Sequence, residues 1–66
     1  MRFTKMQGVG NDFVVVDGDE LPPHISLPAL AIQTCDRKFG IGADGLLVVS
    51  RDQSGAAFRM WMFNPD

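Results

Sequence analysis

The hydrophobic and polar positions of the chain predict two strands, one helix and two further strands, in that order. The clearest element is the run Phe13-Val14-Val15-Val16, because four consecutive bulky apolar residues are typical of a strand buried on both faces. The expected strands cover residues 2–7, 12–17 and 46–50, and a fourth contains Phe58 to Phe63. The pattern therefore predicts an α/β chain of the α+β type, with mixed or antiparallel strands packed on one helix.

The helix is predicted to follow the extended segment at Pro22-Pro23. Ser26 is a good N-cap, and Pro28 is tolerated because it falls in the first turn. An apolar face then recurs at helical spacing, formed by Leu27, Leu30, Ala31, Thr34 and Cys35. Arg37 and Lys38 suit the last turn, where their charges complement the helix dipole, and Gly40 suits termination. We therefore expect the helix to continue close to Gly40.

The last residues of the sequence predict a hydrophobic strand with no further segment after it to pack against it. Residues 52–55 (Asp-Gln-Ser-Gly) are typical of a hairpin loop, and the strand after them alternates between two faces. Phe58, Met60 and Met62 share one face, whereas Arg59, Trp61 and Phe63 share the other. Asn64-Pro65-Asp66 then forms a turn directly after the strand. We interpret the chain as an amino-terminal fragment of a larger protein.

Length, charge and cysteine content exclude several classes of function. Sixty-six residues make at most one small domain, and one cysteine and one histidine supply neither a disulfide nor a metal cluster. A net charge of −2 with scattered Lys and Arg gives no basic surface for nucleic acid. No apolar run approaches the roughly 20 residues that cross a bilayer, and no secretory signal is visible. A lone cysteine favours a reducing cytoplasm.

The octet Met6 to Phe13 holds the first candidate for ligand binding. Gly8 and Gly10 allow a sharp turn or a close approach to a ligand, and Asn11 follows directly. Its amide donates and accepts hydrogen bonds without carrying charge, so it could orient a polar small molecule from the edge of a strand. The alternative is a simple glycine turn in which Asn11 bonds its own backbone. Spacing alone favours that simpler interpretation.

A glycine-rich segment, Gly40-Ile41-Gly42-Ala43-Asp44-Gly45, fits the G-x-G-x-x-G pattern of dinucleotide sites. That chemistry requires the glycines to follow a strand and open a helix, whose N-terminal amides receive the pyrophosphate. Here the predicted order is reversed, because a helix precedes the glycines and a strand follows them. We therefore expect a helix-to-strand connection close to a substrate pocket, and no nucleotide site.

Other residues that could carry chemistry have simpler explanations. Cys35 lies on the apolar helix face, where a free cysteine behaves as a small hydrophobe, so we expect it in the core. His24, beside two prolines, is expected to be exposed, and Trp61 is expected to be buried. Asp12 and Asp44 are more typical of turns or caps than of catalytic acids and bases.

Three segments, taken together, resemble diaminopimelate epimerases. They are Met1-Arg2-Phe3-Thr4-Lys5-Met6 with the octet, Cys35 to Gly45, and Met62-Phe63-Asn64-Pro65-Asp66. Each segment alone is a weak signal. Together they occur in the order and at the spacing typical of the family, and they cover nearly the entire chain. The resemblance implies residues 1–66 to be a partial amino-terminal domain of a two-domain epimerase whose carboxy-terminal remainder is absent.

The resemblance also implies a reaction and a division of labour. Diaminopimelate epimerases invert LL- to meso-diaminopimelate without a cofactor, in lysine and peptidoglycan precursor biosynthesis, with a thiolate and a thiol on opposite faces of the α-carbon. Neither family cysteine matches a residue of this chain, so no catalytic residue is expected in it. Asn11 and Asn64 match asparagines that bind substrate. Some members carry glutamine where this chain has Gly45, and that contact is not carried over. The parent is expected to be a cytoplasmic homodimer.

Two alternatives stay open at this point. A related cofactor-independent racemase or isomerase of the same fold could share these segments while acting on another amino acid. A non-catalytic module could instead use the glycine loops to bind a small ligand. No nucleic acid or membrane partner is expected in either case.

Overall fold

The structure, a computed structural model, describes residues 2–51 and 58–65. Its elements are β1 (Phe3–Gln7), β2 (Asp12–Asp17), the 3₁₀ helix η1 (Gly18–Glu20), α1 (Leu27–Cys35), β3 (Gly45–Arg51) and β4 (Phe58–Phe63). The order strand, strand, helix, strand, strand is therefore confirmed. The hairpin loop predicted at residues 52–55 lies outside the described residues.

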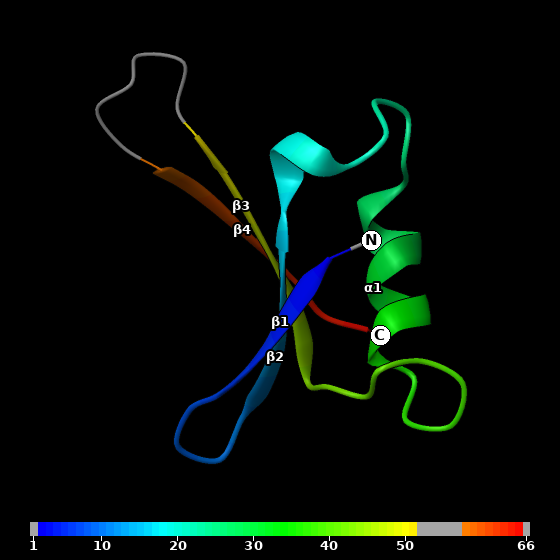
Figure 1. Ribbon diagram of the computed structural model, residues 1–66. Helices are drawn as coiled ribbons and strands as arrows, with labels where there is room; N and C mark the ends of the chain where they lie inside the picture. The colour runs from blue at the N-terminus through cyan, green and yellow to red at the C-terminus, as the bar shows by residue number, and fades with distance from the viewer. Residues whose placement is uncertain (1, 52–57, 66) are drawn as a thin grey trace.

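The strands form one four-stranded mixed sheet in the order β1-β2-β3-β4. β1 pairs antiparallel with β2, and β3 pairs antiparallel with β4, whereas the central pair β2 and β3 is parallel. Two parallel neighbours need a crossover connection, and α1 lies within it. Figure 1 shows α1 on one side of the twisted sheet. This arrangement confirms the α+β fold of mixed strands on a helix.

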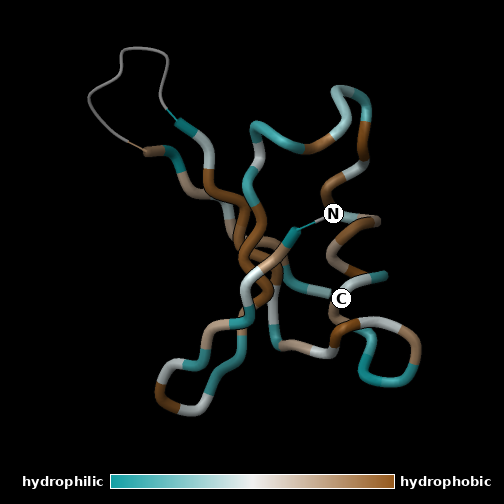
Figure 2. The backbone as a smooth tube through the Cα atoms, in the orientation of Figure 1, coloured by the Kyte–Doolittle hydropathy of each residue, from teal (hydrophilic) through white to brown (hydrophobic). Residues whose placement is uncertain are grey.

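The hydrophobic core lies between α1 and the even-numbered residues of the two central strands. Val14 and Leu46 pair across the sheet and are fully buried, and Val16 and Val48 pair beside them with 2% exposure each. The helix contributes Leu30, Ala31 and Cys35 to the same cluster. Figure 2 shows the hydrophobic colour concentrated in the middle of the central strands. Burying a side chain of this size stabilises a fold by about 1.5–3 kcal/mol, so these strands hold the sheet to the helix.

The other face of the sheet is only partly covered by the described residues. Phe13 and Val15 are half-buried there, so the prediction that the run 13–16 is buried on both faces is wrong. Met60 and Met62 of β4 are 67% and 49% exposed on this face. Side chains alternate across a strand, and α1 covers only the face to which the even residues of β2 point.

Trp61 also departs from expectation, because it is 42% exposed instead of buried. It pairs with Val48 and therefore lies on the helix side of the sheet. β4 is an edge strand with a described neighbour on one side only, so a large ring there is incompletely enclosed. Cys35 in the core and His24 at the surface are placed as predicted.

The start of α1 is as expected, but its end is not. Ser26 is the N-cap, with its hydroxyl accepting from the Ala29 amide at 3.3 Å. The helix then ends at Cys35, and the prediction that it continues towards Gly40 with basic residues in its last turn is wrong. Asp36 leaves the helical conformation, and its carboxylate accepts from the amides of Lys38 and Phe39 at 2.8 and 3.0 Å. Such local side-chain bonds compete with helix continuation.

The connection after Asp36 folds back onto the helix end and satisfies its carbonyl groups. Ile41 and Gly42 donate to the Thr34 carbonyl, and Ala43 donates to the Cys35 carbonyl. Gly40 is needed because a Cβ atom there would lie 2.2 Å from the Gln33 carbonyl oxygen. Gly40 therefore permits close packing of two backbone segments five residues beyond the helix end.

This packing predicts different costs for two glycine-to-alanine substitutions. Gly40→Ala should lower the free energy of unfolding by about 1–3 kcal/mol, because the methyl group forces backbone atoms apart. Gly8→Ala is the matched control, since a Cβ atom there meets nothing within 4 Å, and its effect should stay within about 0.5 kcal/mol. Urea denaturation of the two variants measures both values. Equal stability of the two would contradict the close approach.

Candidate functional site

The strand register brings both predicted asparagines to the same end of the sheet. Asn11 directly precedes β2 and Asn64 directly follows β4, while Gly45 begins β3 between them. The pairs Phe13 with Gly45 and Leu46 with Phe63 fix this alignment. Two strand spacings separate the chains that carry the asparagines, which is roughly 10 Å across the sheet. Residues more than fifty positions apart in sequence thus border one region.

Asn11 closes the turn between β1 and β2 through its backbone. The Gly8 amide donates to the Asn11 carbonyl at 2.8 Å, and Gly10 adopts a positive φ of 80° that favours glycine. The Asn11 side chain is exposed and has no hydrogen-bond partner among residues 2–51 and 58–65. The simple turn interpretation thus accounts for its carbonyl group but leaves the side-chain amide available.

Asn64 is likewise exposed at the end of β4. Its side chain makes no hydrogen bond to any described residue. Because unpaired amides at a surface are solvated, both asparagines can exchange water for a polar ligand without breaking a bond within the described chain.

Asp12 and Asp44 join the first turn to the connection before β3. The Asp12 amide donates to Asp44 Oδ2 at 2.8 Å, and the Asp44 amide donates to the Asp12 carbonyl at 2.9 Å. Arg37 Nη2 donates to Asp44 Oδ1 at 3.1 Å. Lys5 Nζ and Arg37 Nη1 lie 3.7 and 3.9 Å from Asp12 Oδ2. Both aspartates therefore have structural partners, in agreement with the predicted turn and cap roles.

Sequence reasoning assigned Arg37 to the helix dipole and so missed this bridge. The predicted helix-to-strand connection was the one feature of the sequence that could have indicated this bridge. Asp44 is seven residues from Arg37 and becomes adjacent because the loop folds back. The long-range partner Asp12 is 32 residues from Asp44 and gives no local sequence signal.

The connection also settles the geometry of the glycine-rich segment. α1 precedes Gly40 and β3 begins at Gly45, so no helix N-terminus follows the glycines and the dinucleotide arrangement does not form. A Cβ atom at Gly45 would lie 3.2 Å from the Met62 sulfur and 3.3 Å from Phe13 Cδ1. Gly45 is thus flanked by side chains of the partly covered face of the sheet.

Hydrogen bonds lower the pKa of two carboxylates in this connection. The amide of Asp12 and the neighbouring Arg37 lower the pKa of Asp44 from its ordinary value of 3.8. The amides of Phe39 and Lys38 lower the pKa of Asp36 from the same value. In both cases hydrogen bonds to the ionised form outweigh the opposing effect of burial.

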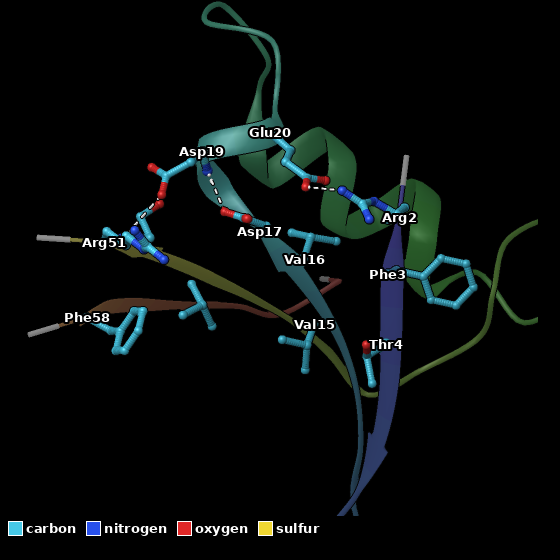
Figure 3. Close-up of a pocket in the computed structure, with 12 residues that line it drawn as sticks. Arg2, Phe3, Thr4, Val15, Val16, Asp17, Asp19, Glu20, Arg51 and Phe58 are labelled. Carbon is cyan, nitrogen blue, oxygen red and sulfur yellow. Dashed lines mark hydrogen bonds and ion pairs between the residues drawn. The ribbon is translucent and has the colours of Figure 1, made fainter.

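A separate hollow of about 810 Å³ lies at the opposite end of the sheet. Two contacts join residues of its rim: the Arg2 side chain donates to Glu20 at 2.7 Å, and the backbone amide of Arg51 donates to Asp19 at 3.2 Å (Figure 3). Neither Asn11 nor Asn64 lines it. The hollow therefore does not coincide with the candidate site.

The described part of the chain contains neither a cluster of metal ligands nor a membrane-spanning helix. No group of three or more His, Cys, Asp or Glu side chains there could hold a metal ion. No helix in residues 2–51 or 58–65 is long and apolar enough to cross a membrane.

Comparison with known proteins bears on the same segments. Residues 3–66 match the family model described as diaminopimelate epimerase. The chain belongs to this family. It is 47% identical over 66 residues to the diaminopimelate epimerase of Picosynechococcus sp. and 52% identical over 66 residues to that of Caldanaerobacter subterraneus subsp. tengcongensis. It is also 45% identical over 67 residues to the chloroplastic enzyme of Oryza sativa subsp. japonica.

These alignments cover all of this chain but a minor part of each epimerase. The chain spans 24% of the Picosynechococcus relative, 23% of the Caldanaerobacter relative and 19% of the rice relative. The family match includes the three segments singled out in the sequence, apart from Met1 and Arg2, so the resemblance drawn from them is confirmed.

The low pKa values predict how the stability of this epimerase segment depends on pH. A carboxylate with a depressed pKa contributes stability above its ordinary value of 3.8 and loses that contribution as the pH falls through the folded-state pKa. Asp44→Asn should therefore lower the melting temperature at neutral pH and flatten its decline between about pH 5 and pH 2. Asp36→Asn should do the same.

Thermal unfolding followed by circular dichroism across that pH range measures the effect. Gln33→Ala changes an exposed residue of α1 and should leave the shape of the profile unchanged. Parallel profiles for the parent and Asp44→Asn would show that ionisation of Asp44 contributes no pH-dependent stability.

Proposed function

We propose that this chain serves as the amino-terminal segment of a diaminopimelate epimerase and holds the polar ends of the substrate. The observation that carries the proposal is the pair of exposed amides of Asn11 and Asn64 at one end of the sheet, neither of which makes a hydrogen bond to residues 2–51 or 58–65. The match over residues 3–66 supports the reaction class. The complete enzyme would invert LL- to meso-diaminopimelate without a cofactor, as a cytoplasmic homodimer.

Neutral amides suit a ligand that carries ammonium and carboxylate groups. The amide oxygen accepts from an ammonium group, and the amide nitrogen donates to a carboxylate. Two such groups, on chains two strand spacings apart, can hold the polar groups of an amino acid while the reacting carbon is placed between acid and base. Binding and orientation are therefore the contribution that this segment makes.

Cys35 does not fit the role of acid or base. Its side chain is 4% exposed within the core cluster, beside Leu30 and Ala31. Proton transfer requires a group within hydrogen-bond reach of the substrate. The Cys35 thiol is enclosed between α1 and the sheet and has no such access. The two thiols of the proposed reaction would both come from outside residues 1–66.

The first functional prediction concerns the 66-residue chain by itself. Incubated in D₂O with diaminopimelate, it should incorporate no α-deuterium and invert no stereocentre, because inversion by two bases needs two groups that reach the α-carbon. Mass spectrometry of the recovered amino acid measures this. Turnover that disappears in Cys35→Ala would contradict both the division of labour and the core position of Cys35.

The second functional prediction uses a complete polypeptide, in which residues 1–66 replace the matched segment of the Caldanaerobacter epimerase. Asn11→Ala and Asn64→Ala should each lower kcat/KM by about 10- to 150-fold, because a charged ligand group loses a hydrogen bond worth about 1.5–3 kcal/mol. Gln33→Ala removes an exposed amide from α1 and should leave kcat/KM unchanged. Steady-state kinetics on the folded fraction separates these effects from stability.

The same polypeptide tests substrate identity and the binding role together. Asn→Asp keeps the side-chain size but adds negative charge, so it should be worse than alanine beside a substrate carboxylate and better tolerated beside an ammonium group. Deuterium incorporation into several amino acids then identifies the substrate. Near-parental kcat/KM in both alanine variants would mean that Asn11 and Asn64 are structural, and preference for another amino acid would indicate a related racemase.

A further inference from the structure

The peptide group between Asn11 and Asp12 is held from both sides. Its carbonyl oxygen accepts from the Gly8 amide at 2.8 Å, and its N–H group donates to Asp44 Oδ2 at 2.8 Å. Because a peptide group is planar and its plane contains both flanking Cα atoms, these two hydrogen bonds fix the position of the Asn11 Cα atom. They therefore constrain the point from which the Asn11 side chain leaves the backbone.

The first of these bonds belongs to the turn, but the second depends on a side chain from a distant segment. Ile41, Gly42 and Ala43 direct their amides to the carbonyl groups at the end of α1. The connection therefore turns towards the helix just before β3, and the Asp44 carboxylate receives the Asp12 amide. A carboxylate that accepts a backbone N–H makes a stronger bond than a neutral acceptor.

Asp44 is in turn fixed by two other contacts. Its own amide donates to the Asp12 carbonyl at 2.9 Å, and its Oδ1 atom accepts from Arg37 Nη2 at 3.1 Å. The two carboxylate oxygens thus have different partners, which prevents free rotation of the group. Lys5 belongs to the same cluster, with its Nζ atom 3.7 Å from Oδ2 of Asp12. Two acidic side chains, Asp12 and Asp44, therefore face two basic ones, Lys5 and Arg37.

We propose that Asp44 is a positioning residue that sets the orientation of Asn11 towards the substrate, with Arg37 holding its carboxylate. This inference rests on the proposed binding role of Asn11. Asp44 need not touch the substrate, since its effect passes through the Asn11–Asp12 peptide. Small displacements of a binding group lower catalytic rates strongly, because the reacting atoms leave their productive geometry.

A double-mutant cycle in the complete polypeptide described above tests this dependence. Asp44→Ala should lower kcat/KM by about 10- to 100-fold in the parent. In the Asn11→Ala background the same change should cost less than about 2-fold, because the group that Asp44 positions is already gone. Asp44→Asn retains an oxygen that can accept from the Asp12 amide, so it should recover most of the lost kcat/KM.

Asp19→Ala supplies the matched control. Asp19 Oδ2 accepts from the Arg51 amide at 3.2 Å, which is also a carboxylate-to-backbone bridge over 32 residues, but at the opposite end of the sheet. Its loss should lower the melting temperature and leave kcat/KM unchanged in both backgrounds. Hydrogen exchange measured by mass spectrometry should accelerate about 10-fold or more in peptides containing Asp12 for Asp44→Ala, and not for Asp19→Ala.

The outcomes separate the positioning role from the proposed function. Equal fold losses for Asp44→Ala in the two backgrounds, or unchanged exchange at Asp12, would overturn the positioning role while leaving the binding role of Asn11 intact. If Asn11→Ala alone leaves kcat/KM at the parental value, the proposed binding role fails and the positioning role fails with it. Strong coupling together with accelerated exchange supports both.

Discussion

The arrangement of this chain depends on the burial of Val14, Val16, Leu46 and Val48 beneath α1. These residues pair β2 with β3 in parallel, and parallel neighbours must begin at the same end of the sheet. The antiparallel outer strands then end where the central strands begin. Asn11 before β2 and Asn64 after β4 therefore meet at one end as a consequence of core packing. The common position of the two asparagines at one end of the sheet therefore follows from the topology.

Local signals in the sequence were sufficient to predict most of the elements. The apolar run at 13–16 and the Ser26 cap with Pro28 identified β2 and the start of α1, because both depend on residues close together in the chain. A mixed sheet was among the expectations, but the sequence did not indicate that β2 and β3 are the parallel pair, since strand order depends on how the crossover folds. The incomplete burial of Phe13 and Val15 and the exposure of Trp61 were also not predicted. Burial of a strand residue depends on which element covers the strand, and that is set by the tertiary arrangement.

The end of α1 shows where local propensity fails. Arg37, Lys38 and Gly40 are in a favourable order for a helix C-terminus, yet Asp36 binds the next two amides with its side chain and ends the helix first. The residues that follow the helix make contacts with other parts of the fold instead. Arg37 contacts Asp44, and Gly40 packs against the Gln33 carbonyl. The hydrophobic pattern identified the asparagines only as polar residues beside strands, and the family resemblance implied their binding role. Their common position at one end of the sheet required the register.

The charges near the candidate site have a consequence for substrate binding. Asp12 and Asp44 are accompanied by Lys5 and Arg37, so the described cluster carries two negative and two positive groups. Such exposed pairs add little stability individually, but their opposite charges largely cancel at the distance of a ligand. Beside this cluster, the side-chain amides of Asn11 and Asn64 are neutral and make no hydrogen bond to a described residue. Under the proposed function, these two residues therefore orient the substrate through directional hydrogen bonds, and strong charge complementarity would come from outside the described cluster. If the proposed function holds, two neutral amides would leave the acidity of the α-proton to the groups that exchange it, so that binding and proton transfer would lie on separate parts of the complete enzyme.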